Sequence, residues 1–448
     1  MIYEEVAVMF ENVKLKNFKS FENLEFDLTD RNNNPKKLIL IYGENGIGKS
    51  NLASAFFMLS ETLRTMDVRD LMESLLSENS GKIVNNEEFK KYFRTHYKDI
   101  ETLIKENKTV ASDEPMYMEF GFCLAGKSGK YILEMNDSQI IHEYLEYTIT
   151  QRRGVYFDIT PGKILINNKI FCDRASYQAI KKSCVQFWGK HSLLSILLHE
   201  SKDKADQYIK DQIEDRFAEI ILFLSRISCK IKFGSRQERG IIGLPPEIFG
   251  EYEKGSIDKK DEDLLDRTED MLNTFLKKTY RDIVRAYYKR SLDSNKIHYQ
   301  LVITKKISGK DRDIDFSLES TGTQALIQQL PFMLVAVKGS VAIIDEFDTG
   351  IHDLLVKSLA TSLYECIEGQ LIMTTHNTLL MESEIPKDCI YVINETASGN
   401  KEIQCILHYN NKIGEKNNLR KQYLLGKYSG IPEKTVIDFK SLLKKLSN

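Results

Sequence analysis

Residues 43–50 of this 448-residue chain read GENGIGKS and match the pattern G-x-x-x-x-G-K-[S/T]. The apolar run KLILIY comes directly before them, and apolar residues at helical spacing follow. In this strand–loop–helix setting, glycines let successive backbone N–H groups point inward at a phosphate. A lysine adds a mobile positive charge, and a serine hydroxyl can hold Mg²⁺. We therefore predict a phosphate-binding loop that uses Asn45, Gly46, Gly48, Lys49 and Ser50, with Ser50 also a metal ligand.

A second apolar run, Val341–Ile344, ends in the adjacent carboxylates of Asp345 and Glu346. Ligands of α/β sheets bind at the carboxyl ends of the strands, which is where these two acids fall. Asp345 is placed to hold the hydration shell of Mg²⁺, and Glu346 is placed to polarise a water for attack on a γ-phosphate. We predict Asp345 as a second metal ligand and Glu346 as a catalytic residue.

Further segments are placed to reach the same site. The apolar run Gln370–Thr374 is followed by His376, which the order of the strands would bring to the same edge of the sheet. A lone histidine after a strand is more often a turn or core residue. The pentapeptide STGTQ, which begins at Ser320, opens a predicted helix, and Ser or Thr at that point is also an ordinary N-cap. Neither segment is specific by itself.

Taken in chain order, these segments resemble the nucleotide-binding head of ABC-type ATPases. In that resemblance His376 is the switch histidine, a catalytic residue that contacts the γ-phosphate. STGTQ resembles a degenerate signature, which implies that Ser320, Gly322 and Thr323 contact the nucleotide bound by a second subunit. Asp348–His352 is positioned like the D-loop. The resemblance implies ATP and Mg²⁺ as cofactors, ATP hydrolysis, and a head-to-head dimer or a higher even-numbered oligomer.

The stretch Phe10–Phe21, FENVKLKNFKSF, together with the phosphate loop looks like the RecF/OLD/SMC-like branch of these ATPases. Within that branch the chain is most similar to abortive-infection, anti-phage AAA-type ATPases, including the ATPase subunit of PARIS-type systems. The segment Asn418–Pro432, NLRKQYLLGKYSGIP, resembles a segment of those ATPases. The resemblance implies a sensor or scaffold subunit that controls a partner effector, a TOPRIM-like nuclease or toxin. The residues after His376 show no acid-rich strand pattern typical of such a nuclease.

The sequence departs from the ABC pattern at three points. Residues 51–138 contain no Gln, so Gln139 and Gln151 are the next candidates for the Q-loop glutamine, and that role stays unassigned. Thr323 stands where the signature has its second glycine, and His352 stands where SMC proteins carry Asp. These two departures concern the strength of head dimerisation rather than nucleotide binding.

The apolar runs at 38–42, 341–344 and 370–374 alternate with helical patterns, as a parallel sheet buried on both faces requires. We expect an α/β P-loop NTPase fold, an ABC-type ATPase head with a mixed or parallel sheet plus an inserted helical domain. Lys49 and Asp345 are 296 residues apart, which leaves room for that insert. The expected domains are an N-terminal ATPase lobe with a β-rich segment, a helical insert, and a C-terminal ATPase lobe. Their ranges are 1–175, 176–295 and 296–448.

The charge balance provides no global field that would hold nucleic acid or an anionic membrane, because 63 Lys and Arg face 65 Asp and Glu. One local segment, Lys277–Arg290 (KKTYRDIVRAYYKR), has six bases and one acid and could contact nucleic acid. On a helix, one face would gather Lys278, Arg281, Arg285 and Lys289. The neighbouring Glu251–Asp270 has nine acids and four bases, so the two segments could instead pair as a solvated helical hairpin.

No apolar run reaches the roughly 18 residues that span a bilayer, and the N-terminus carries Glu4 and Glu5 where a signal peptide has Lys or Arg. The seven cysteines are scattered and never spaced as CxxC. We expect a soluble, cytoplasmic protein with reduced thiols and no membrane partner.

Three functions remain open from the sequence. The first is an ATPase subunit of an anti-phage defence system, which dimerises around ATP and controls a partner. The alternative is a RecF- or SMC-like DNA-repair clamp that binds DNA directly, for which long coiled-coil arms or a dominant basic surface would be expected. The third is a head that binds ATP as structural glue and hardly hydrolyses it.

Overall fold

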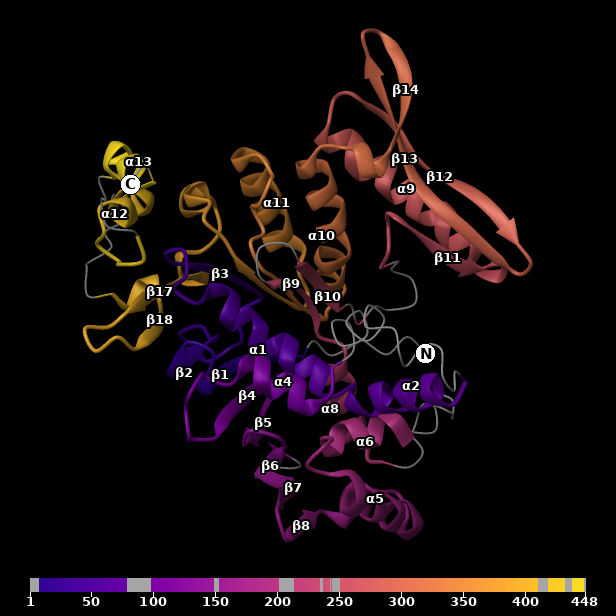
Figure 1. Cartoon of the computed structure of the whole chain (residues 1–448), viewed down its shortest axis with the longest axis vertical. Coiled ribbons are helices and arrows are strands. Elements are labelled where there is room, and N and C mark those ends of the chain that lie inside the picture. Colours follow the sequence, from indigo (N-terminus) through magenta and orange to yellow (C-terminus); the bar gives the residue numbers. More distant parts are fainter. Residues whose placement is uncertain are drawn as a thin grey trace.

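The structure is a computed structural model that describes residues 8–78, 98–148, 153–200, 213–233, 237–241, 243, 250–409, 418–431 and 437–446. Three sheets organise this part of the chain (Figure 1). The central seven-stranded sheet has the order β10-β9-β15-β16-β3-β17-β18. Its strands are β10 (Gln237–Ile241), β9 (Ser228–Phe233), β15 (Val341–Ile344), β16 (Gln370–Thr374), β3 (Leu38–Tyr42), β17 (Ile390–Glu395) and β18 (Lys401–Cys405).

The inner strands of the central sheet, β9, β15, β16, β3 and β17, run parallel, and β10 and β18 pair antiparallel at the two edges. Every residue of β3, β15 and β16 is buried, because helices cover both faces of the sheet. Alternate residues of β3 face opposite cores: Leu38, Leu40 and Tyr42 on one side, Ile39 and Ile41 on the other. This α/β P-loop NTPase fold is the one that the sequence predicts.

The helices divide between the two faces of the central sheet. α1 (Lys49–Thr62) packs between this sheet and the second, antiparallel sheet, with α8 (Asp215–Ser225) in the same core. α10 (Thr321–Val337) and α11 (Asp353–Cys366) cover the opposite face (Figure 1). The remaining helices are α2 (Thr65–Glu78), α4 (Ile100–Asn107), α5 (Arg174–Phe187), α6 (Leu193–Glu200), α9 (Glu262–Thr279), α12 (Leu419–Leu424) and α13 (Phe439–Leu446).

The second sheet is a seven-stranded antiparallel sheet of order β2-β1-β4-β5-β6-β7-β8. Its strands are β1 (Met9–Phe18), β2 (Phe21–Asp27), β4 (Met116–Leu124), β5 (Lys127–Met135), β6 (Ile140–Thr148), β7 (Arg153–Thr160) and β8 (Lys163–Ile166). Gln370 joins it to the central sheet. The fully buried side-chain amide of this residue exchanges two hydrogen bonds of 3.0 Å with the backbone of Phe10 and donates a third to the carbonyl of Lys36. The β-rich segment predicted within residues 1–175 is present as β4 to β8.

The third sheet and α9 project from one end of the molecule (Figure 1). Its strands are β11 (Lys254–Asp258), β13 (Lys296–Ile307), β12 (Ile283–Asp293) and β14 (Lys310–Asp315), all antiparallel to their neighbours. α9 covers one face with Leu265, Leu272 and Leu276. Each leucine that becomes fully buried in such a contact contributes about 2 kcal/mol to folding.

The helix predicted over Lys277–Arg290 is wrong. α9 ends at Thr279, and β12 begins at Ile283, so the bases do not share one helical face. The alternation of Arg285, Tyr287 and Lys289 has the period of a strand, and pairing along β13 decides between the two periods. Among the described residues, the helical character predicted for 176–295 therefore holds for most of α5 and for α6, α8 and α9, whereas β9 to β12 are strands. The division into three domains at 175 and 295 stays a prediction.

The expected pairing of the basic segment with acids is present at Arg290. Its guanidinium lies 2.7 Å from the carboxylates of both Asp266 and Glu269 on α9. Arg285 lies over the ring of Tyr287, 4.5 Å from its centroid.

All seven cysteines are free thiols that form no disulfide. Within the described ranges, no helix has both the length and the hydropathy needed to cross a membrane.

Glu143 on β6 is a fully buried carboxylate in the core beside the second sheet. It accepts hydrogen bonds from the Tyr131 hydroxyl (2.8 Å), the Trp188 indole (2.8 Å) and the backbone N–H of Leu193 (2.7 Å). Burial raises the pKa of Glu143 to about 7, although these hydrogen bonds oppose the rise. Charging Glu143 therefore costs free energy in the folded state.

The raised pKa makes the stability of the protein pH-dependent. The contribution of the neutral Glu143 carboxyl group to the free energy of unfolding is fully present below pH 4.5, and it is lost as the pH rises through about 7. Relative to wild type, Glu143→Gln should therefore be less destabilised at pH 8 than at pH 5, by roughly 2 kcal/mol. Denaturant unfolding at both pH values measures the difference. Glu101→Gln, an exposed carboxylate on α4, is the control. An equal effect of Glu143→Gln at both pH values would contradict the assignment.

Candidate functional site

The loop Gly43–Ser50 connects the carboxyl end of β3 to α1, as predicted. Gly48 is the N-cap of α1 and has φ +119°, a conformation that favours glycine. A Cβ atom there would lie 3.0 Å from the ring of Phe21. Asn45 and Gly46 are exposed at the tip of the loop, whereas Ser50 is half-buried in the first turn of α1. The backbone N–H groups of this turn have no partner within the helix and are the groups that bind phosphate in such loops.

Lys49 lies inside the loop and is 6% exposed. Its Nζ donates hydrogen bonds of 2.8 Å to the carbonyls of Gly43 and Glu44. Burial lowers the pKa of Lys49 to about 8, and the negative charges of Asp345 and Glu346 oppose this shift. The lysine is therefore close enough to both acids to interact with them electrostatically.

Thr374, the last residue of β16, connects the two acids at the end of the neighbouring strand. Its hydroxyl donates to Asp345 Oδ1 at 2.6 Å and accepts from the backbone N–H of Glu346 at 2.7 Å. Asp345 is 4% exposed, and its Oδ2 is buried without a hydrogen-bond partner among the described residues. An unpaired carboxylate oxygen next to a lysine and a phosphate loop fits Mg²⁺, which takes oxygen ligands.

Glu346 has a left-handed backbone, with φ +50°. This conformation costs a residue with a Cβ atom about 1–2 kcal/mol, and strain of this kind collects at functional sites. Its carboxylate accepts hydrogen bonds from Lys232 Nζ (2.5 Å) and Thr349 Oγ1 (2.9 Å). Burial raises the pKa of Glu346, but the two hydrogen bonds and the charges of Lys232 and His376 together outweigh burial, so that its pKa lies below the usual value.

His376 follows β16 and lies at the same edge of the sheet. Its backbone N–H donates to Asp348 Oδ2 at 2.9 Å. Burial and the charge of Lys49 lower the pKa of His376, whereas Asp348 and Glu346 oppose the shift. The structure therefore brings together Lys49, Asp345, Glu346 and His376, four residues singled out from the sequence.

The signature-like segment is held differently from the expectation. The Ser320 hydroxyl caps α10 and accepts from the backbone N–H of Thr323 (3.2 Å). Thr323 is 1% exposed, and its hydroxyl bonds to Ser320 at 2.9 Å, so its side chain points into the protein. Thr321, which is not among the residues predicted from the sequence, is exposed at the start of this helix, as is the N-cap Ser320. Gly322 packs against the D-loop: a Cβ atom there would lie 2.3 Å from the carbonyl oxygen of Gly350.

Sequence reasoning missed several residues of the site. Thr374 ends the apolar strand β16, and Lys232 lies on β9, which reads SCKIKF; no local pattern marks either residue as part of the site. Lys19, in the turn between β1 and β2, donates to Ser54 Oγ at 2.9 Å; burial lowers its pKa to about 8 against the charge of Asp345. Gln139 lies in the turn before β6, among the strands of the second sheet, and Gln151 lies outside the described residues.

The C-terminal segment that resembles defence ATPases packs beside the phosphate loop. α12 buries Tyr423, whose ring lies 5.8 Å from that of Tyr42, the last residue of β3. The Tyr423 hydroxyl donates to the carbonyl of Gly430 at 2.8 Å. Pro432 lies outside the described residues. The segment therefore supports the strand from which the loop starts.

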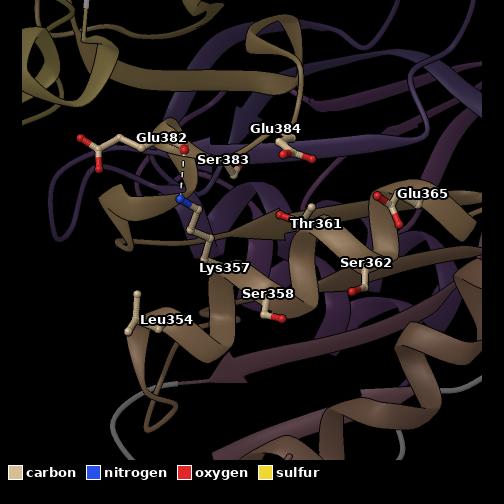
Figure 2. A pocket seen from close by; sticks show the side chains of 9 residues that line it. All are labelled: Leu354, Lys357, Ser358, Thr361, Ser362, Glu365, Glu382, Ser383 and Glu384. Carbon is tan, nitrogen blue, oxygen red and sulfur yellow. Dashed lines mark hydrogen bonds between the residues drawn. The ribbon is translucent and has the colours of Figure 1, made fainter. Parts of the chain in front are cut away.

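A separate groove of about 420 Å³ lies between α11 and the 3₁₀ turn Thr378–Glu382 (Figure 2). Within it, Lys357 donates to the carbonyl of Glu382 at 3.0 Å. It contains none of the predicted site residues. It is lined by Leu354, Lys357, Ser358, Thr361, Ser362, Glu365, Glu382, Ser383 and Glu384.

Residues 38–382 match the sequence profile of a family described as "AAA domain, putative AbiEii toxin, Type IV TA system". The match includes the phosphate loop, both acids and His376. An 87-residue stretch is 36% identical to the chromosome partition protein Smc of Methanocaldococcus jannaschii. The stretch is 19% of this chain, and the chain spans only 7% of that relative.

Solved structures with a distant similarity are SMC and RecF proteins. The SMC head domain from Thermotoga maritima is 15% identical, with 89% of this chain and 99% of that chain covered and a TM-score of 0.36. An SMC head bound to the C-winged helix domain of ScpA is 14% identical, with coverage of 88% and 97% and a TM-score of 0.42. The recombination mediator RecF is 11% identical, with coverage of 89% and 98% and a TM-score of 0.38.

Removal of the Thr374 hydroxyl should destabilise the site from within. Thr374→Val leaves the buried Asp345 oxygen and the Glu346 N–H without their partner, which should lower the free energy of unfolding by about 2–3 kcal/mol. Thr374→Ser keeps the hydroxyl and loses one methyl group, worth about 1 kcal/mol. Denaturant unfolding compares the two variants. A valine variant as stable as the serine variant would show that the hydroxyl does not hold the acids.

Proposed function

This chain belongs to the family of AAA domains described as putative AbiEii toxin of type IV TA systems, and from that premise we propose that it binds and hydrolyses ATP with Mg²⁺. The observation that carries the proposal is the meeting of Lys49, Asp345 and Glu346 at one edge of the parallel sheet. A buried lysine beside a phosphate loop can balance the negative charge of a phosphate, and the two acids can balance the positive charge of a metal ion. Few other ligands require this combination.

The proposed roles follow from the position of each group. Lys49 and the N–H groups of the loop bind the β- and γ-phosphates, with Asn45, Gly46 and Gly48 forming the loop wall. Ser50 and Asp345 are the side chains that would hold Mg²⁺, which neutralises charge on the phosphates when bound.

The Glu346 carboxylate accepts a hydrogen bond from the attacking water and thereby polarises that water. His376 lies beside Lys49 at the same sheet edge, where it can contact the γ-phosphate. The water oxygen bonds to the γ-phosphorus as the bond from that phosphorus to the bridging oxygen of the β-phosphate breaks. The products are ADP and phosphate, and the phosphate keeps the oxygen of the water. The main contribution of the protein to catalysis is to position these groups and to stabilise charge.

We further propose that two copies meet head to head, so that the N-terminus of α10 in one copy faces the nucleotide of the other. Exposed Thr321 and half-buried Gly322, which packs against the D-loop, would make this contact, while Ser320 and Thr323 hold the helix end. The side-chain amide of Gln324 supports the same end by donating to the carbonyls of Phe316, Ser317 and Glu319. A rigid helix N-terminus suits an anionic ligand.

The biological role that we propose is a subunit of an anti-phage, abortive-infection system, resembling the PARIS-type ATPase, that controls a partner such as a TOPRIM-like nuclease. The family description, which names a putative toxin of a toxin–antitoxin system, supports a defence setting. The alternative of a DNA-binding repair clamp has less support, because Arg290 and Arg285 of the basic segment are engaged by neighbouring side chains.

Loss of the phosphate-loop lysine should greatly weaken nucleotide binding. Lys49→Ala removes the buried cation from the loop, which should weaken ATP binding by about 3 kcal/mol, or roughly 100-fold in Kd. Titration calorimetry with ATP and Mg²⁺ measures this. The control is Lys163→Ala, a lysine on β8 that pairs with Asp158 at 3.2 Å. Unchanged affinity in Lys49→Ala would exclude the loop as the nucleotide site.

Replacement of Glu346 should separate ATP binding from ATP hydrolysis. Glu346→Gln keeps the size of the side chain and loses the charge that polarises water, so kcat should fall by about 10²–10⁴-fold while ATP still binds. The trapped nucleotide should raise the proportion of dimer, measured as mass by light scattering. A variant that hydrolyses ATP as fast as wild type would contradict the role of Glu346.

DNA distinguishes the two functions. If the chain is a repair clamp, duplex DNA alone should stimulate ATP turnover at physiological salt, where weak electrostatic contacts are screened. The defence proposal expects little stimulation without a partner protein. Strong stimulation by DNA would favour the clamp over our proposal.

A further inference from the structure

Lys232 reaches Glu346 from the neighbouring strand of the sheet. β9 and β15 are parallel, with Ile344 in register with Lys230, and the ladder extends through a 2.8 Å hydrogen bond from the Asp345 N–H to the Lys230 carbonyl. Two residues further along each of these two segments, this register brings Lys232 beside Glu346. The ion pair is therefore a consequence of strand pairing.

The Glu346 carboxylate is held from two sides. Lys232 Nζ and Thr349 Oγ1 both donate to the same oxygen, Oε2, at 2.5 Å and 2.9 Å. The backbone of Glu346 is fixed by its left-handed conformation and by the hydrogen bond to Thr374. Together these contacts come from β9, from the D-loop and from β16. They limit the rotation of a side chain that otherwise has three free torsions.

The ion pair contributes little to stability. The Lys232 and Glu346 side chains are 34% and 32% exposed, and ion pairs with this access to solvent contribute about 0–1 kcal/mol. Glu346 also has the charges of His376 and Lys49 nearby. Lys232 donates a hydrogen bond directly to the Glu346 carboxylate. Its specific effect is therefore on the position of that carboxylate.

We propose that Lys232 is a positioning residue, which holds the Glu346 carboxylate in the orientation needed to polarise the attacking water. The proposal rests on the proposed ATPase function, and it adds a residue that no part of the nucleotide-binding pattern marks. In this proposal Lys232 acts through Glu346 rather than on the nucleotide itself. A misplacement of about 1 Å at such a group can cost up to about 100-fold in rate.

The test is steady-state ATP hydrolysis with Mg²⁺ by the full chain. Lys232→Met keeps the length of the side chain and removes the charge, so kcat should fall about 10-fold while the KM for ATP stays within about twofold. Lys232→Arg can still donate to Oε2 and should recover most of the rate. Lys163→Met, which breaks an exposed ion pair on β8, is the matched control and should change neither parameter.

A double variant tests whether Lys232 acts through Glu346. In the Glu346→Gln background, Lys232→Met should cause no further loss of kcat, because the group that it positions is already inactive. A full additional 10-fold loss would show that Lys232 acts elsewhere. The free energy of unfolding of Lys232→Met, measured in denaturant, should remain close to that of wild type.

Other results would overturn the proposal in identifiable ways. If Lys232→Met leaves kcat unchanged or raises it, then Lys232 does not position the base. If the KM for ATP rises instead, Lys232 contacts nucleotide directly. In both cases wild-type hydrolysis and its loss in Glu346→Gln would leave the proposed function intact. If wild type shows no Mg²⁺-dependent hydrolysis, the proposed function fails, and this inference fails with it.

Discussion

The parallel pairing of β3, β16 and β15 is the constraint on which the site depends. Parallel strands end at the same edge of a sheet, so the loop after β3 and the acids after β15 meet although 296 residues separate Lys49 from Asp345. The burial of these strands on both faces by helices fixes their register. Among the described residues, the chain between β3 and β15 forms β4 to β8 of the second sheet, β9 and β10 of the central sheet, and the third sheet, and it leaves this edge intact.

The charges at this edge are balanced among themselves. Lys49 is almost fully buried, and a buried lysine needs nearby acids to remain charged. Asp345 and Glu346 supply that charge, and the Thr374 hydroxyl connects the two acids across β15 and β16. Asp345 Oδ2 is buried without a hydrogen-bond partner among the described residues, and this is where we propose that Mg²⁺ binds. The same arrangement that makes the site costly to fold makes it suited to a phosphate–metal ligand.

The sequence predicts the parts of the site that depend on local patterns. Glycines, a following helix and apolar strands identify the loop, the acids and His376, because each is fixed by residues adjacent in the chain. Thr374 and Lys232 could not be predicted, since their roles arise from strand order and register. The strand Ile283–Asp293 cannot be told from a helix in the sequence, because bases spaced four apart fit a helix as well as an alternating strand. The pentapeptide does not show which of Thr321 and Thr323 is buried, since burial at a helix start depends on what packs against it.

The central claim is that ATP and Mg²⁺ bind at this sheet edge and are completed by a second copy of the chain. A crystal structure of the Glu346→Gln variant with ATP and Mg²⁺ tests it most directly. We expect Lys49 on the phosphates, Asp345 facing the metal, and the α10 N-terminus of a second copy, with Thr321, at the γ-phosphate. Nucleotide bound away from Lys49 and Asp345, or bound there with no second copy at the γ-phosphate, would contradict it.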